Sequence, residues 1–366
     1  MTRVVLAPDS FKGTITAADA ASALAEGWTS VEPGASFVHR PMADGGEGTV
    51  AAFAAAVPGA RRMPVTVDGP AGTPVDAAWL LLPATADAPA GTAVIDLAST
   101  SGIELLVELR PWDADTTGFG QAIAAALDHG VSRLVLGIGS SASTDGGTGM
   151  LTALGARFLD ASGAPVDRGA RGLVEIASVD LSGLRAAPHV RVLTDVTNPL
   201  TGARGAAAVF GPQKGLDADG IRRADAALAR LAGLLGLDTA APGTGAAGGT
   251  GGALVVWGAT LAPGAAEVAE LIGLGDAIAE ADVVITGEGS YDGQSGDGKV
   301  PSFIAGLAAD ARVTALLAAG RITADADTAL FAASSSLTDL AGSTDAALAD
   351  PARWLREAGA ALARAV

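Results

Sequence analysis

Short apolar runs alternate along most of this chain with alanine-rich stretches of helical periodicity, and this alternation limits the folds available to it. The pattern is typical of α/β proteins, in which helices that follow strands cover a sheet. Strands are expected at the apolar runs 3–7, 36–41, 62–67, 133–138, 190–194, 283–286 and 312–317. Helices are expected at 16–28, 47–56, 115–129, 145–155, 219–236, 265–280, 300–309 and 345–364. Thr16 and Asp19 form a capping-box pattern at the first helix.

The middle of the chain departs from this rhythm. From Pro64 to Leu97, Pro, Gly and Thr separate short apolar segments, which predicts hairpins. We therefore expect two α/β domains. The first, a parallel-sheet domain, would comprise 1–65 and 265–366, and the second, an inserted α/β domain, would comprise 66–264. The Gly-rich stretch 241–253 is interpreted as an interdomain linker or as the approach to an apolar helix.

Composition excludes several kinds of site. The chain has 366 residues, enough for two cores, and contains no cysteine, which rules out disulfides, thiolate metal sites and a cysteine nucleophile. No apolar run reaches the ~18 residues of a membrane span. The apolar run at the N-terminus is too short for a signal peptide. These features predict a cytoplasmic protein without a membrane partner.

The net charge of −17 argues against nucleic acid and anionic membranes as partners, since both attract basic proteins. An anionic small molecule would have to be bound by local positive charge. Only three of the 23 basic residues are lysines, and each of the three, Lys12, Lys214 and Lys299, stands next to a glycine. This pairing favours a compact charge where the backbone can approach a ligand.

Polar, Gly-rich loops follow the predicted strands repeatedly. They occupy residues 8–13, 42–49, 137–147, 194–202 with 210–215, and 286–299. Ligands of open parallel sheets bind at the carboxyl ends of the strands. Backbone N–H groups and lysines hold phosphates, while carboxylates hold Mg²⁺ or accept a proton. A turn-forming role is the commoner explanation for any one loop, but five such loops together favour phosphoryl transfer.

One loop comes close to a phosphate-binding motif. Residues 293–299 fit GxxxxGK, but Val300 stands where the P-loop has a Ser or Thr hydroxyl for Mg²⁺. Pro301 suits the first turn of a helix. We therefore reject a Walker motif and expect a helix that begins at a phosphate, with Lys299 as a point charge.

A second loop gives an alternative interpretation. Gly137–Ala142 matches GxGxxA after a strand, and Asp160 follows about 20 residues later, as in dinucleotide sites. An NAD-dependent oxidoreductase is therefore the alternative function. It is disfavoured because STDGGTG separates the motif from the expected helix.

The three histidines are expected to have structural roles, and no acyl-transfer nucleophile is evident. His39, His129 and His189 lie in or beside predicted elements without metal-ligand spacing. Ser140 and Ser141 lack the Gly-flanked elbow of an acyl-transfer nucleophile. A hydrolase of that kind is a poor fit.

Six motifs, in order over the whole chain, resemble those of the bacterial two-domain glycerate kinases of the glycerate 2-kinase type. They are APDSFKG, PMADGGEGT, GIGSSASTDGG, DVTNPLTG, FGPQKG and TGEGSYDGQS with a following GK. The resemblance implies ATP-dependent phosphorylation of D-glycerate with Mg²⁺, in glyoxylate and sugar-acid breakdown, with 2-phosphoglycerate favoured as the product. It also implies a Rossmann- or flavodoxin-like domain interrupted by a different α/β domain, with the active site in the cleft between the two domains.

Several positions differ from the motifs usual in that family. Ser140 replaces Gly, Ser143 replaces Thr, Thr144 replaces Asn, Thr201 replaces Cys, Ser290 replaces Arg, and Tyr291 replaces Leu. The loss of an arginine at position 290 is the most consequential, because it removes a cation beside a phosphate or carboxylate site. It puts substrate identity and rate in question, and a non-catalytic metabolite-binding protein on the same scaffold is a further alternative.

The resemblance assigns roles residue by residue. Lys12, Asp44 and Asp195 are the predicted catalytic residues, Lys12 neutralising the transferred phosphoryl group. Of Asp44 and Asp195, one would bind Mg²⁺ and the other would accept the glycerate proton, and Glu288 is a third metal candidate. The predicted substrate- and phosphate-binding set is Ser10, Gly13, Gly45, Gly46, Ser140, Ser141, Asp145, Asn198 and Lys214.

The predicted nucleotide-binding set is Gly287, Glu288, Asp292, Gly298 and Lys299. Glycerate's carboxylate would bind to donors of the SSAS loop and to a cation, either Lys214 or Arg204. A turn or cap role is open for every one of these residues, and for Asp145 an N-cap is as good an interpretation as a ligand. A monomer or homodimer is expected.

Overall fold

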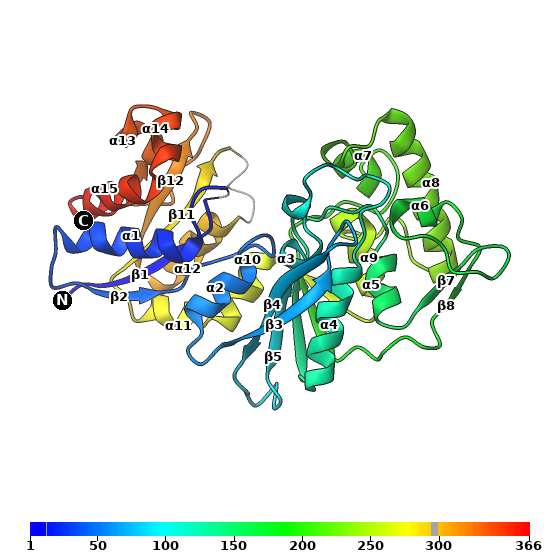
Figure 1. The fold of residues 1–366 in the computed structure, drawn as a ribbon. Coiled ribbons are helices and arrows are strands. Elements are labelled where there is room, and N and C mark those ends of the chain that lie inside the picture. Colours follow the sequence, from blue (N-terminus) through cyan, green and yellow to red (C-terminus); the bar gives the residue numbers. More distant parts are fainter. Residues whose placement is uncertain (12, 294–298) are drawn as a thin grey trace. The chain divides into compact units, whose positions relative to one another are not determined.

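The computed structural model describes residues 1–11, 13–293 and 299–366, which divide into two compact units (Figure 1). Unit 1 comprises Met1–Asp44, Ala51–Pro58 and Ala265–Val366, and unit 2 comprises Gly45–Val50 and Gly59–Gly264. The sequence-based boundary at 65/66 is displaced, because it cuts through strand β3 (Arg61–Asp68), which lies whole in unit 2. Residues Gly45–Val50 also belong to unit 2, which the sequence did not indicate.

The seven strands predicted from the apolar runs all occur, and the described chain contains thirteen strands in all. Unit 1 contains β1 (Arg3–Pro8), α1 (Ala17–Thr29), β2 (Ser36–His39), most of α2 (Thr49–Ala56), α10 (Gly264–Leu271), α11 (Leu274–Ala279), β11 (Val283–Tyr291), α12 (Val300–Ala311), β12 (Thr314–Ile322), β13 (Ala333–Ser336), α13 (Leu337–Ala341), α14 (Thr344–Ala349) and α15 (Pro351–Ala363). The cap predicted at α1 is present, since the Thr16 hydroxyl accepts from the Asp19 backbone N–H at 3.1 Å.

The sheet of unit 1 is entirely parallel, in the order β13-β12-β11-β1-β2. Numbered along this unit alone, that order is 2-1-3-4-5, the flavodoxin-like arrangement, so the predicted fold class is confirmed. The order reverses between β1 and β11. Val4 and Leu6 of β1 pack with Ile285 of β11 and with buried residues of α1 and α15, including Leu24 and Leu355, in one core.

Unit 2 contains β3, β4 (Pro74–Leu82), β5 (Thr92–Asp96), α3 (Ala98–Ser101), a 3₁₀ turn (Ile103–Leu105), α4 (Thr117–His129), β6 (Arg133–Gly137), α5 (Thr148–Ala153), β7 (Arg157–Leu159), α6 (Gly169–Leu173), β8 (Ser178–Asp180), β9 (His189–Leu193), α7 (Ala206–Phe210), a 3₁₀ turn (Pro212–Lys214), α8 (Ala218–Leu235), a 3₁₀ turn (Ala246–Gly249), α9 (Thr250–Val256) and β10 (Thr260–Ala262). Its main sheet has the order β10-β9-β6-β5-β4-β3. Strands β3, β4 and β5 pair antiparallel, as the hairpin pattern predicted, and the remaining pairs are parallel.

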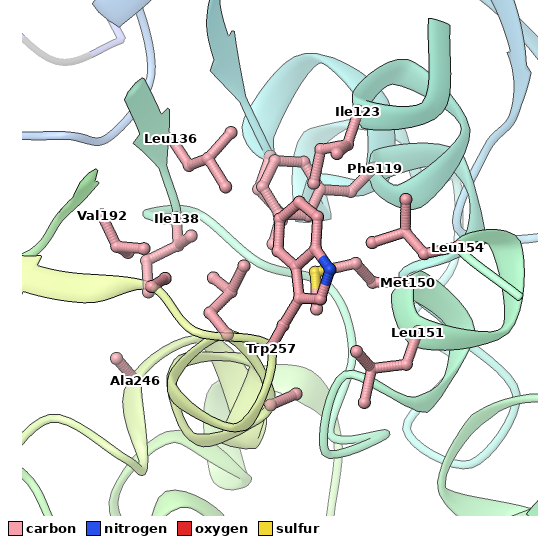
Figure 2. Close-up of a cluster of buried hydrophobic side chains, with 14 of the residues drawn as sticks. Phe119, Ile123, Leu136, Ile138, Met150, Leu151, Leu154, Val192, Ala246 and Trp257 are labelled. Carbon is pink, nitrogen blue, oxygen red and sulfur yellow. The ribbon is translucent and has the colours of Figure 1, made fainter. Parts of the chain in front are cut away.

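The core of unit 2 lies between this sheet and the helices that follow its strands. Figure 2 shows Phe119 of α4 and Met150 of α5 beside Trp257, with Leu136 and Val192 on strands β6 and β9. The indole Nε1–H of Trp257 donates to the Arg185 carbonyl oxygen at 2.8 Å, so its polar atom is satisfied inside the cluster.

Three expectations about elements were wrong. The stretch 241–253 is not an interdomain linker, because it lies inside unit 2, where Ala246 is 1% exposed; the alternative, the approach to an apolar helix, is confirmed, since α9 begins at Thr250. The helix expected at 265–280 is two helices, α10 and α11, separated at Gly273, which adopts a left-handed φ of 65°. The helix expected at 345–364 is likewise α14 and α15, since Pro351 cannot continue the hydrogen bonding of the preceding turn.

Candidate active site

The loops after β6 and β9 line a pocket of about 370 Å³ in unit 2. Ser140 and Ser141 come from the first loop, Thr194 from the second, and Lys214 from the 3₁₀ turn after α7. The predicted linker supplies another wall, with Ala246 and Ala247. Sequence reasoning missed this wall because alanines between glycines carry no polar signal.

Lys214 carries the charge of this pocket. Its side chain is buried, with the residue 3% exposed, and its Nζ donates to the Ser141 hydroxyl oxygen at 3.3 Å and to the Ser143 carbonyl oxygen. Burial lowers the pKa of Lys214 to about 8, an effect that the charge of Asp145 opposes. The ammonium group has three N–H bonds, so one is left for a bound group once these two acceptors are satisfied.

Asp145 lies beneath the serine loop and is completely buried. Its carboxylate accepts hydrogen bonds from the backbone N–H groups of Thr116, Gly147 and Gly149 and from the hydroxyls of Thr116 and Ser143, at 2.7–3.2 Å. These five donors occupy both oxygens. Of the two interpretations left open for Asp145, this geometry favours a structural one, in which the carboxylate ties the loop to the start of α4.

Ser143 is therefore held from two sides. Its hydroxyl donates to Asp145 and its carbonyl oxygen accepts from Lys214. A buried cation and a buried anion thus fix the same loop residue. Because the pocket wall at Ser140 and Ser141 is continuous with Ser143, its shape depends on this pair of charges.

Asp115 is a second buried carboxylate near this loop, and sequence reasoning did not single it out. It is 1% exposed and accepts from the Thr117 backbone N–H at 2.7 Å. Burial, together with the nearby charge of Asp145, raises the pKa of Asp115 to about 6. Arg168, at 3.8 Å, opposes the shift.

The pocket contains unusual backbone geometry. Ser140 has φ 57° and Ala247 has φ 52°, a left-handed conformation that costs side chains other than glycine of order 1 kcal/mol. Both residues line the pocket. Such strain persists where the surrounding structure enforces it, and two of the three positive-φ residues other than glycine in the described chain are found here.

Gly45 and Gly46 pack against the loop after β6. The Gly45 carbonyl oxygen accepts from the Gly139 N–H at 3.0 Å. A Cβ at Gly137 would lie 2.6 Å from that oxygen, and a Cβ at Gly139 would lie 2.5 Å from the Gly46 Cα. The glycines of the two motifs therefore permit a close approach of two backbones, which joins residues distant in sequence.

Asp195 and Asn198 follow β9. Asp195 is exposed, and its Oδ1 accepts from the Gly264 N–H at 3.1 Å, at the first residue of α10. The Asn198 side-chain N–H donates to the Arg204 carbonyl oxygen at 2.8 Å, which closes its own loop. Arg204 is exposed and does not line the pocket, whereas Lys214 does.

In unit 1 the predicted residues gather where the strand order reverses. Asp9 and Ser10 follow β1, and the Asp9 N–H donates to the Gly287 carbonyl oxygen of β11 at 2.8 Å. A Cβ at Gly287 would collide with the Ala318 carbonyl oxygen of β12. Ligands of this fold bind at such a switch point. Lys12 and Gly298 lie outside the described residues.

Lys299, a predicted nucleotide-binding residue, lies at the start of α12. Lys299 is the N-cap of α12, and its Nζ lies 3.6 Å from the Asp292 carboxylate. Pro301 occupies the first turn, as predicted. Asp44 and Glu288 are both half-buried, and Gly13 has a left-handed φ of 75°.

The dinucleotide alternative conflicts with the topology. In such sites the acidic residue follows a strand of the same parallel sheet as the Gly-rich turn. Asp160 instead follows β7, which pairs only with β8 in a separate two-stranded sheet. Its carboxylate accepts from Ser162 and Ala164 within its own turn.

Within the described residues, no group of three or more His, Cys, Asp or Glu side chains is arranged to hold a metal ion. This does not conflict with Mg²⁺, which binds in kinases through one or two carboxylates together with substrate phosphates. No helix of the described chain has the length and apolar character needed to cross a membrane.

Comparison with known proteins identifies the family to which this chain belongs. The chain belongs to the glycerate kinase family, whose model matches residues 4–366, and such enzymes are phosphotransferases. It is 41% identical over 338 residues to the glycerate kinase of Bacillus subtilis (strain 168), covering 89% of this chain and 86% of that protein. It is 39% identical over 334 residues to the glycerate 2-kinase of Escherichia coli (strain K12), covering 88% and 86%.

A solved structure extends the similarity to the fold. The crystal structure of a protein proposed to be glycerate kinase 2 from Salmonella typhimurium LT2 matches with a TM-score of 0.85 and 39% identity, covering 99% of this chain and 97% of that one. The resemblance seen in the six motifs is thereby confirmed. Family membership supports neither the oxidoreductase nor the metabolite-sensor alternative.

Proposed function

We propose that this chain transfers the terminal phosphoryl group of ATP to D-glycerate, with 2-phosphoglycerate as the product. The observation that carries the proposal is the small pocket of unit 2, in which the buried Lys214 lies beside the hydroxyls of Ser140 and Ser141. A volume of about 370 Å³ suits a small hydroxy acid, and donors with one positive charge suit its carboxylate. The apolar walls, including Ile138 and Phe210, strengthen that charge by excluding water.

The phosphoryl donor is proposed to bind at the switch point of unit 1. Gly287, Glu288, Asp292, Gly298 and Lys299 are the proposed nucleotide contacts, and Ser10 and Gly13 are proposed phosphate contacts. Mg²⁺ would shield the phosphate charge when bound, held by Asp44, Asp195 or Glu288. Lys12 would neutralise charge that develops on the transferred group.

Asp44 and Asp195 are the candidates for accepting the hydroxyl proton. A positioned carboxylate can accept the proton of a hydroxyl group as a general base. Asp145 is proposed to position the serine loop, with Gly45, Gly46 and Asn198 in the same supporting role. The proposed setting is glyoxylate and sugar-acid catabolism in the cytoplasm, where ATP is available, as a monomer or homodimer.

The test is the formation of ADP by the purified protein with Mg-ATP and D-glycerate, followed by phosphorus NMR of the product. We expect ADP formation that depends on D-glycerate and the spectrum of 2-phosphoglycerate. A spectrum of 3-phosphoglycerate would correct the position of transfer. Folded protein that forms no ADP with D-glycerate would overturn the substrate assignment.

A further inference from the structure

Ser290 lies opposite an arginine on the neighbouring strand. Strands β11 and β12 pair parallel, with Ser290 in register with Arg321. An Nη2 hydrogen of Arg321 donates to the Ser290 hydroxyl oxygen at 3.4 Å. Position 290 is the one at which the family's usual motif has arginine, so the guanidinium group lies next to the place where that motif has one.

Both side chains point to the same face of the sheet. Val283 and Ile285 of β11 pack into the core with α1 and α15, and alternate residues of a strand point to opposite faces. Glu288 and Ser290 therefore point away from that core, as does Arg321, because paired residues share a face. The buried residues of α12, which packs on β11 and β12, are absent from the α1–α15 core, which places α12 on this second face.

The charge of Arg321 is available to a ligand. Arg321 is exposed, and in the part of the chain that the structure describes no carboxylate lies within ion-pair distance of it. Lys299, at the start of α12, differs in this respect, since Asp292 lies 3.6 Å from it. Arg321 also stands near the carboxyl end of β12, the end of a parallel strand at which ligands bind.

We infer that Arg321 supplies, from β12, the cation that is missing at position 290, and that it binds an oxyanion of the reactants. The inference rests on the proposed function. A guanidinium group presents two parallel N–H donors, which match the oxygens of a phosphate or a carboxylate. The position beside the proposed nucleotide contacts favours a phosphate of ATP, and the carboxylate of D-glycerate is the other source of the same chemistry.

The experiment exchanges the two residues. Four proteins are compared: the wild type, R321S, the exchange variant S290R/R321S, and R364S as a control. Arg364 is an exposed arginine at the end of α15 in the same unit. Calorimetry gives the Kd of Mg-ATP, steady-state kinetics gives the KM of D-glycerate, and thermal unfolding shows that each protein is folded.

We expect R321S to weaken binding of one of the two anions roughly tenfold or more, the magnitude of a lost charge-assisted hydrogen bond. A change in the Kd of ATP identifies the phosphate, and a change confined to the KM of D-glycerate identifies the carboxylate. The exchange variant should recover to within about threefold of wild type, and R364S should match wild type. Recovery of binding in the exchange variant would show that Arg321 supplies a charge to the ligand, because an arginine with a purely structural role could not be replaced from position 290.

Two results would overturn the inference. In the first, R321S leaves both the Kd of ATP and the KM of D-glycerate as they are in R364S. In the second, R321S is impaired but the folded exchange variant does not recover. A wild type that binds Mg-ATP but forms no ADP with D-glycerate would refute the proposed substrate alone, and the Kd of Mg-ATP in R321S would still decide whether Arg321 binds a phosphate.

Discussion

Lys214 carries a buried charge that lowers the stability of the folded protein, so we expect its role to lie in binding and not in stability. Its pKa in the folded protein is lowered to about 8, so the unfolded chain binds the proton more tightly. The free energy of unfolding therefore rises as pH increases from about 8 toward the ordinary lysine value. At pH 7 the buried charge costs about 3 kcal/mol relative to that limit.

Replacement of Lys214 by methionine should separate activity from stability. We expect K214M to lower kcat/KM for D-glycerate by about ten- to hundredfold, because the anion loses its cation. Thermal unfolding at pH 7 should shift little, since relief from the buried charge offsets two lost hydrogen bonds. Wild-type KM should rise as pH passes about 8, where Lys214 loses its proton. An unchanged kcat/KM in K214M would contradict the proposed carboxylate site.

Asp115 is a second buried ionisable group, and its effect on the free energy of unfolding changes with pH in the opposite direction. Because the folded protein raises the pKa of Asp115 to about 6, the folded state holds the proton more tightly than the unfolded chain. The free energy of unfolding should therefore decrease as pH rises from about 4 to about 6, by about 3 kcal/mol.

The variant D115N removes this charge while it keeps an acceptor for the Thr117 N–H. We expect D115N to be at least as stable as wild type at pH 7 and to lose most of the pH dependence between about 4 and 6. Urea unfolding at several pH values measures both. A D115N variant that is clearly less stable at pH 7 would show that the ion pair with Arg168 outweighs burial.

At the scale of elements, the parallel pair β11 and β12 depends on a glycine. Gly287 is in register with Ala318, whose carbonyl oxygen would collide with any added Cβ. The variant G287A should therefore separate the strands at the proposed nucleotide site. We expect a loss of stability of about 2 kcal/mol or more and weaker ATP binding.

A matched glycine lies in the adjoining helix. Gly306, in α12, has open space where a Cβ would stand. G306A should stabilise the protein by up to about 1 kcal/mol and leave ATP binding unchanged. Chemical unfolding of both variants makes the comparison. Equal effects of the two substitutions would refute the steric explanation for Gly287.

At the scale of the whole molecule, unit 2 has a core of its own. Every residue of the cluster around Trp257 lies within Gly59–Gly264. We therefore expect the fragment 59–264 to fold, with cooperative thermal unfolding and near-ultraviolet circular dichroism from buried Trp79 and Trp257. A fragment without a cooperative transition would show that Gly45–Val50 or unit 1 is needed for its stability.

The overall negative charge also belongs to this scale. At −17 the protein repels anionic substrates as a whole, so binding depends on a few placed cations. Lys214 is buried in the pocket of unit 2, whereas in unit 1 Arg321 lies near the carboxyl end of β12 and Lys299 at the start of α12. Because so few cations are placed at the proposed sites, we expect the substitution of any one of them to weaken anion binding strongly.

The sequence alone determined the fold class, the seven apolar strands and the family, because periodicity and ordered motifs are local signals. It could not reveal that Ala246 and Ala247 form a pocket wall, that Asp145 is buried under five donors, or that Ser290 pairs with Arg321. Burial, strand register and pKa values depend on residues distant along the chain. Tertiary structure alone decides which residues meet, and here it places Arg321 of β12 next to Ser290 of β11.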